Sequence, residues 1–366
     1  MWKYEDVNQV NIEISSLCNS ICAWCPRYEN MSSLINKQLT PTYVTLEQFK
    51  DWFPTDFISQ IDNWAYSGDY GDAGTNPDLL QIFEYTFKYN SEASVEVNTN
   101  GGMKTPKFWY QLGKLFSERK QRKVIFSIDG LEDTNHIYRR NVKWHKVLEN
   151  ASAFLEAGGE AYWDFLIFKH NQHQVEEVLN LADKMGFKEV RVKYPQGFDG
   201  GNMQVRDKEL NVLYEIEPIS PDYIKDTHTK LNGAMAEDIS YDVWGEAMET
   251  RYIDEEGEIN CYSMRSGTEI RVMSDGMVYP CVHFGHLSMN LKESQQILKA
   301  QMIEFFKEKH LSLKNKTLKE ILSYDPFSKI YNSWDKKSCL TCWLNCGSKP
   351  IMQQIYKNEG KIYGTT

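Results

Sequence analysis

The sequence predicts an α/β protein built on a parallel sheet with helices on its outside. Short strand-like runs alternate with amphipathic helical patterns from about residue 9 to residue 194. Alternation of this kind gives parallel strands joined by crossover helices. The predicted strands are Val10–Ser15, Trp64–Ser67, Ser94–Thr99, Lys123–Asp129, Ala161–Phe168 and Glu189–Tyr194. The predicted helices between them are Leu46–Trp52, Leu79–Tyr89, Pro106–Glu118, His145–Ala157 and Gln174–Met185.

Boundary residues support several of these helices. Thr45 is a favourable N-cap for the first helix, and Asn171 or Gln172 can open the fifth. Gly158 and Gly186 follow the fourth and fifth helices, where a left-handed residue commonly ends a helix. Function in such a fold is expected at the carboxyl ends of the strands.

Composition indicates a cytoplasmic protein. The chain has 366 residues, 41% of them hydrophobic, which is enough for one large domain and a smaller one. Its start is polar and unlike a signal peptide, and no apolar run approaches the ~18 residues of a membrane span. A net charge of −10 disfavours nucleic acid as a partner, because phosphate binding needs a basic face. Eight cysteines in a chain of this length indicate metal binding rather than a disulfide framework.

Three cysteines follow the first predicted strand with the spacing C-x3-C-x2-C: Cys18, Cys22 and Cys25. Three thiolates on one loop can bind three irons of a cubic iron–sulfur cluster and leave the fourth iron open, whereas electron-transfer clusters commonly have four cysteines. An open iron indicates chemistry at the cluster. The alternative is a zinc knuckle, or a disulfide beside a free thiol; zinc usually takes four ligands, and no fourth candidate lies nearby.

This loop, with Trp24 before its last cysteine, resembles that of the radical S-adenosylmethionine (radical SAM) superfamily. The resemblance covers about residues 9–195 and implies six β-α units that form a partial TIM-like barrel. It also implies a [4Fe-4S] cluster whose open iron binds SAM. Reductive cleavage of SAM would then give a 5′-deoxyadenosyl radical that abstracts hydrogen from a substrate.

The loop after the second predicted strand carries the next part of the resemblance. Gly71 and Asp72 match the Gly-Glu core of a Gly-Gly-Glu-Pro-like run that holds the SAM amino group in this family. Asp72 stands in place of Glu, and Ala73 in place of Pro, so the loop is expected to be less rigid. An ordinary glycine-rich turn is the alternative.

Two further strand ends resemble SAM-binding runs of the family. Asn100 lies in a Thr-Asn-Gly run, and Ser127 and Asp129 lie in a Ser-Ile-Asp-Gly run. Short polar side chains there are expected to reach the ribose and carboxylate of SAM, while glycine allows close backbone approach. Arg139 lies where the family often has an arginine and is expected to contact the SAM carboxylate, with a surface salt bridge as the alternative.

A hairpin and two helices are predicted in the last third of the chain. Alternating runs at Thr268–Met273 and Met277–Val282 flank an Asp-Gly turn, which is a hairpin signal. Helical patterns follow at Ser294–Lys309 and Thr317–Ser323. The stretch between the barrel and this region, residues 196–255, lacks periodicity and reads as a linker or insertion.

Five cysteines accompany this hairpin. Cys261, Cys281, Cys339 and Cys342 supply four thiolates, and Cys346 either replaces one of the last pair or lies free nearby. The pattern resembles the twitch domain, a shortened SPASM extension that holds one auxiliary [4Fe-4S] cluster in this family. A zinc ribbon is the alternative, because four thiolates also suit zinc.

The sequence therefore predicts a radical SAM oxidoreductase or modifying enzyme. Its expected divisions are 1–195 for the radical SAM core, 196–255 for the linker and 256–366 for the twitch-like domain. The expected partners are a peptide or small polar substrate and a one-electron donor such as flavodoxin or ferredoxin, without a membrane. The alternatives are a non-enzymatic zinc module and a SAM-binding relic that serves as a partner protein.

Overall fold

The computed structural model describes residues 2–195, 197–198, 201–220, 223, 259, 261–264, 267–285, 311–323, 325–332, 342 and 346. Within them an eight-stranded sheet has the order β12-β11-β1-β3-β4-β5-β7-β8. Its strands are β1 (Val7–Ile12), β3 (Asn63–Tyr66), β4 (Ser94–Thr99), β5 (Arg122–Ser127), β7 (Glu160–Leu166), β8 (Glu189–Lys193), β11 (Thr268–Val272) and β12 (Val278–Tyr279). Every neighbouring pair is parallel except β11 and β12.

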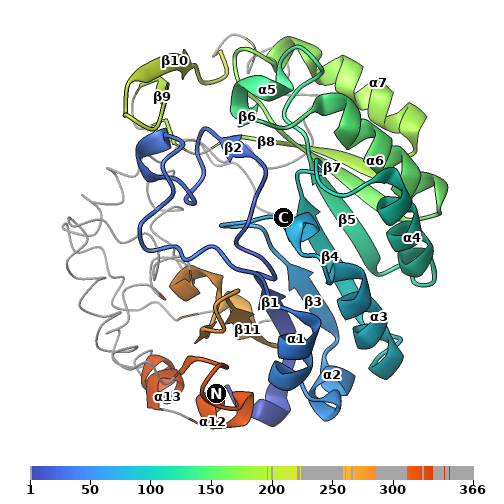
Figure 1. The fold of residues 1–366 in the computed structure, drawn as a ribbon, viewed down its shortest axis with the longest axis vertical. Helices are drawn as coiled ribbons and strands as arrows, with labels where there is room; N and C mark the ends of the chain where they lie inside the picture. Colours follow the sequence, from blue (N-terminus) through green and yellow to red (C-terminus); the bar gives the residue numbers. More distant parts are fainter. Residues whose placement is uncertain are drawn as a thin grey trace.

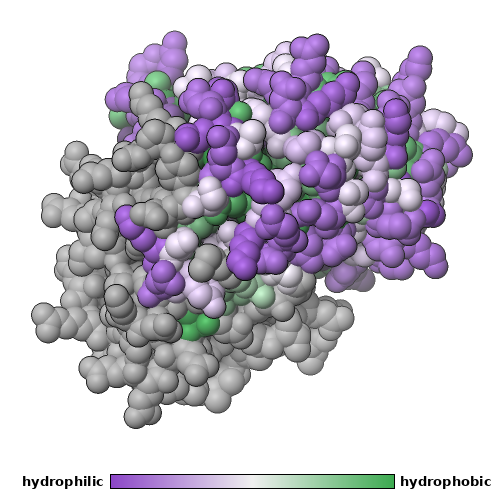
Figure 2. Space-filling model, turned by 90° about the horizontal axis from the view of Figure 1, so that it is seen from below, coloured by the Kyte–Doolittle hydropathy of each residue, from purple (hydrophilic) through white to green (hydrophobic). Residues whose placement is uncertain are grey.

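Helices cover the outer side of this curved sheet, as Figure 1 shows for α3, α4, α6 and α7. The α-helices of the barrel are α1 (Leu46–Trp52), α2 (Thr55–Gln60), α3 (Leu79–Tyr89), α4 (Pro106–Ser117), α5 (Asn135–Tyr138), α6 (Trp144–Glu156) and α7 (Val175–Met185). Further along the chain come α12 (Leu318–Leu322) and α13 (Asp325–Asn332). The visible outer surface of the helical layer is mostly hydrophilic (Figure 2). None of the helices described is long and apolar enough to cross a membrane.

Local signals in the sequence explain where these helices begin and end. Thr45 forms a capping box with Gln48 at the start of α1. Gly186, with a φ of 89°, ends α7 in the left-handed region. The predicted strands and helices that lie within the described residues are confirmed, each end within three residues of its predicted position. The predicted helix Ser294–Lys309 lies outside the described residues.

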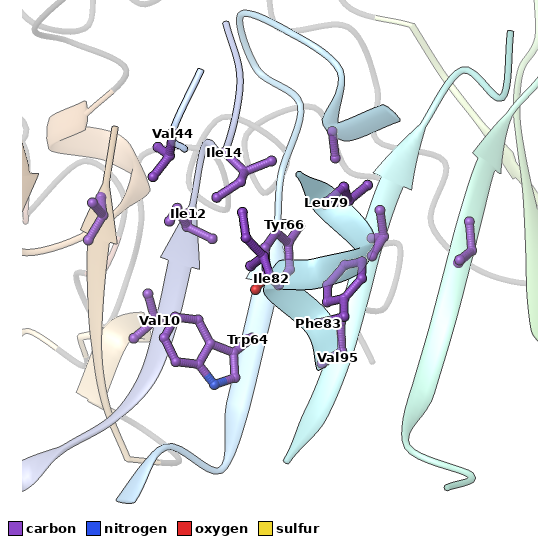
Figure 3. Packing of buried hydrophobic residues seen from close by; sticks show 14 of the residues in the cluster. Val10, Ile12, Ile14, Val44, Trp64, Tyr66, Leu79, Ile82, Phe83 and Val95 are labelled. Carbon is purple, nitrogen blue, oxygen red and sulfur yellow. The ribbon is translucent and has the colours of Figure 1, made fainter. Parts of the chain in front are cut away.

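The core lies between the sheet and its helices. Side chains alternate along each strand, so that Val95 and Val97 of β4 are buried while Glu96 and Asn98 are partly exposed. Figure 3 shows Tyr66 of β3 beside Ile82 and Phe83 of α3, while Trp64 lies nearer to Val10 of β1. Tyr66 and Phe83 pack edge to face with ring centroids 4.8 Å apart. Full burial of each such large side chain contributes about 1.5–3 kcal/mol.

The opposite face of the sheet is polar and charged. Lys123 Nζ lies 2.9 Å from Glu96 Oε2, and Arg191 Nε lies 2.5 Å from Asp164 Oδ1. The exposed fractions of these four side chains lie between 14% and 33%, so the side chains are neither buried in the core nor fully exposed to solvent. A parallel sheet with one apolar and one polar face leaves a hydrophilic interior beside the carboxyl ends of its strands.

The C-terminal hairpin belongs to the same sheet. Strand β11 pairs in parallel with β1, in the register Val10↔Ile270, Asn11↔Arg271 and Ile12↔Val272. All five residues of β11 are buried. Segments about 260 residues apart in sequence therefore lie side by side (Figure 1), and the β1 edge of the barrel is covered by a strand from the region expected to be a separate domain.

Part of the segment expected to be a linker forms a second hairpin, β9 (Met203–Arg206) and β10 (Val212–Ile216). Its buried side chains Met203, Val205 and Ile216 form a small core with Tyr138 and Phe168. The turn contains no glycine. Asp207 Oδ1 instead accepts hydrogen bonds from the N–H groups of Glu209 and Asn211, both at 2.9 Å. The hairpin lies within residues 196–255, which were expected to be a linker or insertion without regular structure.

Candidate metal centre

The first cysteine loop is held at the carboxyl edge of the sheet by a short ribbon. Strand β2 (Ile21–Cys22) pairs antiparallel with β6 (Arg139–Arg140), in the register Cys22↔Arg139. The N–H of Ala23 also donates to the carbonyl oxygen of Tyr138 at 3.1 Å. Cys18, Cys22 and Cys25 are all free thiols and half-buried. The backbone therefore fixes the loop that carries the three sulfurs.

The surroundings of these thiols disfavour their charged form when no cation is near. Burial raises the pKa of Cys18 to about 12, and the negative charges of Asp72 and Cys22 act in the same direction. Burial and Cys22 likewise raise the pKa of Cys25. Three neighbouring thiolates are therefore unfavourable by themselves, and a cationic metal group is what would stabilise them together.

Several donors point at the sulfur atoms. Ser20 Oγ lies 3.0 Å from Cys22 Sγ, and the N–H of Ser20 donates to Cys18 Sγ at 3.3 Å. Asn100 Nδ2 donates to Cys18 Sγ at 3.6 Å. Hydrogen bonds to sulfur stabilise negative charge on a cluster and tune its potential. The loop thus combines three candidate ligands with an outer shell of donors.

Asp72 joins two successive strand ends next to this loop. Its Oδ1 accepts hydrogen bonds from the Gly74 N–H and from Thr99 Oγ1, both at 2.8 Å, and its Oδ2 accepts one from the Asn100 N–H at 2.7 Å. Burial raises the pKa of Asp72, although these hydrogen bonds oppose the shift. The side chain is buried and has a partner on each oxygen, so it fixes the backbone of both loops.

Gly71 lies where the chain passes closest to the strand end of β1. A Cβ at this position would lie 2.0 Å from the Ser15 carbonyl oxygen and 2.6 Å from Ser16 Cα. Only glycine permits such an approach. The glycine-rich run predicted from the sequence is therefore in contact with the segment that leads into the cysteine loop.

Asn100 and Trp24 also lie at this edge. Asn100 Nδ2 donates to Asn19 Oδ1 at 2.9 Å, which places the side chain between the cysteine loop and the end of β4. The indole ring of Trp24 lies against the backbone of Gly197, where an added Cβ would be 2.4 Å from the ring. The structure therefore brings Asp72 and Asn100 together beside Cys18, with Trp24 on the same loop.

Asp129 and Arg139 form a buried ion pair, with Arg139 Nε 2.6 Å from Asp129 Oδ2. Asp129 Oδ1 accepts a hydrogen bond from the Leu166 N–H at 2.7 Å, and the side chain is fully buried. Arg139 Nη1 also donates to Cys22 Sγ at 3.7 Å. Ser127 ends β5 and is paired with Asp164 of β7 on the polar face. Contacts of these three residues with SAM remain predictions.

Sequence reasoning missed Arg27, which lies two residues after Cys25. Its guanidinium is buried, and Nη1 donates to the carbonyl oxygens of Ser16 and Tyr70, the latter at 3.0 Å. Arg27 therefore joins the cysteine loop to the loop after β3. The sequence signal that could have indicated this role is a cationic residue directly after the cysteine motif.

The second group of cysteines is described in part. The side chains of Cys261 and Cys346 share a hydrogen bond, which is the main reason why the pKa of Cys261 is raised, and Cys281 acts on it in the same direction. Burial raises the pKa of Cys281 to about 12, while the backbone N–H groups of Phe284 and His283 donate to its sulfur. Cys342 is buried, and Cys339 lies outside the described residues. The structure thus brings Cys346, expected to be the spare residue, next to Cys261.

In the part of the chain that the structure describes, no three or more Cys, His, Asp or Glu side chains are arranged to hold a single ion. The three thiols of the first loop fit a larger group better, because a cluster separates its ligands by the width of the cluster itself.

A parallel sheet with a three-cysteine loop at its carboxyl edge is the arrangement expected of an α/β protein that binds a metal cluster. Residues 12–188, just under half of the chain, match the family model of the Radical SAM superfamily, so this segment belongs to that superfamily. The match supports a [4Fe-4S] cluster and SAM as cofactors. The search of curated proteins found no match.

Solved structures of similar fold include proteins crystallised with SAM. SuiB from Streptococcus suis superposes with a TM-score of 0.52 at 15% identity, over 92% of this chain and 71% of SuiB. The protein anSMEcpe with bound SAM superposes with a TM-score of 0.50 at 17% identity, over 92% of this chain and 87% of the other. Another SuiB structure, with a TM-score of 0.51, contains the precursor peptide SuiA. At these identities the similarity concerns the fold.

Proposed function

We propose that this enzyme cleaves SAM reductively and abstracts hydrogen from a peptide or small polar substrate. The observation that carries the proposal is the position of Cys18, Cys22 and Cys25 beside Asp72 and Asn100, at one edge of the sheet. When bound and reduced, the cluster supplies one electron to SAM, which yields the 5′-deoxyadenosyl radical.

The residues of the chain would hold and orient these groups. The three cysteines would bind three irons, leaving one iron for the amino and carboxylate groups of SAM. Asp72 orders the backbone of Gly74 and Asn100 around the amino-group site. Ser127, at the end of β5, would contact the ribose of SAM.

A second cluster is proposed for the C-terminal region. The contact between Cys261 and Cys346, with Cys281 nearby, supports Cys346 as a ligand. Cys342 or Cys339 would then complete the set. Such a cluster would accept an electron from an oxidised substrate radical, or bind substrate at an open iron. A zinc ribbon at the same cysteines is the competing candidate.

The polar face of the sheet supports a polar substrate. Lys123, Asp164 and Arg191 retain partial exposure on the side away from the helices. SuiB, which shares the fold, has been crystallised with a peptide. The first electron would come from a donor such as flavodoxin or ferredoxin, and the free thiols fit a reducing cytoplasm.

Metal analysis after anaerobic reconstitution tests both clusters. We expect about eight irons per chain without zinc, in keeping with two four-iron clusters. The triple variant Cys18→Ala/Cys22→Ala/Cys25→Ala should retain about four, and Cys346→Ala should lose the other four. Zinc in place of iron at the first loop would overturn the proposal.

SAM turnover provides the second test. With dithionite and SAM, the reconstituted protein should release 5′-deoxyadenosine, and the triple cysteine variant should release none. Binding of SAM without any turnover would instead support the SAM-binding relic. A panel of peptides and polar metabolites, assayed for deuterium transfer into 5′-deoxyadenosine, would then identify the substrate class.

A further inference from the structure

Arg271 is a buried cation at the junction between the C-terminal hairpin and the barrel. It lies on β11, in register with Asn11 of β1, and its side chain is 1% exposed. Because β11 covers the edge of the barrel sheet, this guanidinium is delivered into the barrel from a segment about 260 residues away from its partners.

The guanidinium has a polar partner on each of its nitrogens. Nη2 donates to Glu13 Oε2 at 2.7 Å and to Asp69 Oδ2 at 2.8 Å. Nη1 donates to Asn11 Oδ1 and to Ser67 Oγ, and Nε to the sulfur of Met273 at 3.4 Å. Two of these partners lie on or directly after β1, and two lie directly after β3. Arg271 therefore joins the ends of both strands to β11.

Glu13 connects Arg271 to the loop that carries Asp72, because its carboxyl group accepts hydrogen bonds from both. Its Oε1 accepts a hydrogen bond from the Tyr70 N–H at 2.8 Å, and the Gly71 N–H also donates to the carboxyl group. Asp72 is the next residue, and it orders the backbone of Asn100. A continuous series of contacts thus runs from Arg271 through Glu13 to the proposed SAM amino-group site.

We propose that Arg271 is a positioning residue for SAM, through which the C-terminal hairpin holds the loop after β3 in its binding conformation. The inference rests on the proposed function. Arg271 does not itself touch the SAM site; it fixes the carboxyl group that fixes the Tyr70 and Gly71 backbone. The barrel would therefore bind SAM well only when the hairpin is seated beside β1.

The main test compares Arg271→Met with Arg122→Met in the reconstituted full-length protein. Arg122 is an equally buried arginine at the start of β5, away from the carboxyl edge of the sheet. It donates to the carbonyl oxygens of Leu115 and Ser91 and stacks on Phe87. Both variants should lower the melting temperature. Only Arg271→Met should weaken SAM binding, by about tenfold or more, and reduce the change in the cluster's electron paramagnetic resonance spectrum on SAM addition.

Two further variants keep the test decisive. Arg271→Lys should recover part of the affinity, because it restores a cation beside Glu13 and Asp69. If Arg271→Met alone does not fold, Glu13→Gln/Arg271→Met avoids a buried carboxylate without a cation and should still bind SAM weakly. An affinity for SAM that is unchanged in Arg271→Met, or equally reduced in Arg122→Met, would overturn the inference. Absence of SAM binding in the wild type would overturn the proposed function instead.

Discussion

The Asn100 N–H donates to Asp72 Oδ2 at 2.7 Å, which ties together the loops that follow two neighbouring parallel strands. Thr99 Oγ1 and the Gly74 N–H occupy the other oxygen. A carboxylate accepts hydrogen bonds only, so all three donors are satisfied by one side chain. Asp72 therefore organises two loops at once.

Asp72→Asn should weaken both folding and SAM binding. An asparagine amide has one oxygen, so its NH2 group must face either the Asn100 N–H or the donors of Gly74 and Thr99. Leaving buried donors unpaired costs about 1–3 kcal/mol of unfolding free energy. Chemical denaturation and SAM titration would measure the two effects. Asp207→Asn, in the exposed turn between β9 and β10, is the control and should change neither; equal effects in both variants would contradict the role of Asp72.

Gly71→Ala should disturb the cysteine loop itself. The new methyl group would lie 2.0 Å from the Ser15 carbonyl oxygen, so the backbone before Cys18 would have to move. We expect fewer irons bound at the first loop after reconstitution, with the C-terminal irons retained. Gly201→Ala is the matched control, because a Cβ there has no atom within 4 Å. Full iron content in Gly71→Ala would show that the loop tolerates the shift.

Local patterns predicted those parts of the fold that local chemistry decides. Strand β4 and helix α3 have the predicted bounds, since alternation and amphipathic spacing are present within each segment. The sequence also indicated that Asp72 and Asn100 lie at strand ends. Short elements escaped notice, such as β9 and β10, whose turn is closed by the Asp207 side chain rather than by glycine.

Contacts between distant parts of the chain leave no comparable pattern within a single segment of the sequence. The predicted hairpin formed, but nothing in its own sequence shows that β11 pairs with β1, because that register depends on residues about 260 positions away. The partners of Arg271 were hidden for the same reason. Asp129 illustrates a related limit, because its motif predicted a cofactor contact but gave no sign of the ion pair with Arg139 or of the hydrogen bond from the Leu166 N–H.

The stability of the protein should fall as pH rises toward 8, because of Glu13. Burial raises the pKa of this carboxyl group from 4.5 to about 8, although Arg271 opposes the shift and Asp69 adds to it. The folded state therefore binds a proton between these values that the unfolded state releases. The resulting stabilisation is complete below pH 4.5 and is lost as pH rises through about 8.

Glu13→Gln removes the titrating group and is the comparison for this effect. The wild type should lose at most ~1.4 kcal/mol of unfolding free energy per pH unit from this one proton. Denaturant unfolding measured between pH 5 and pH 8 should show a shallower decline in Glu13→Gln. Parallel curves for the two proteins would mean that Glu13 is ionised throughout, held so by Arg271 and the Tyr70 N–H.

Arg139→Gln should lower the midpoint potential of the first cluster. Arg139 Nη1 donates to Cys22 Sγ at 3.7 Å, and a cation beside a sulfur ligand favours the reduced, more negative cluster. Each ~1.4 kcal/mol of lost preference for the reduced form lowers a one-electron potential by about 59 mV. A redox titration of the SAM-free protein, followed by electron paramagnetic resonance, would measure the shift.

Arg140→Gln is the neighbouring control, since the Arg140 guanidinium donates to backbone oxygens of Ile21, Ser32 and Arg206. The double variant Asp129→Asn/Arg139→Gln separates the lost cation from the carboxylate that it leaves unpaired. A potential unchanged in both Arg139 variants would show that the arginine serves the fold through Asp129 and does not tune the cluster.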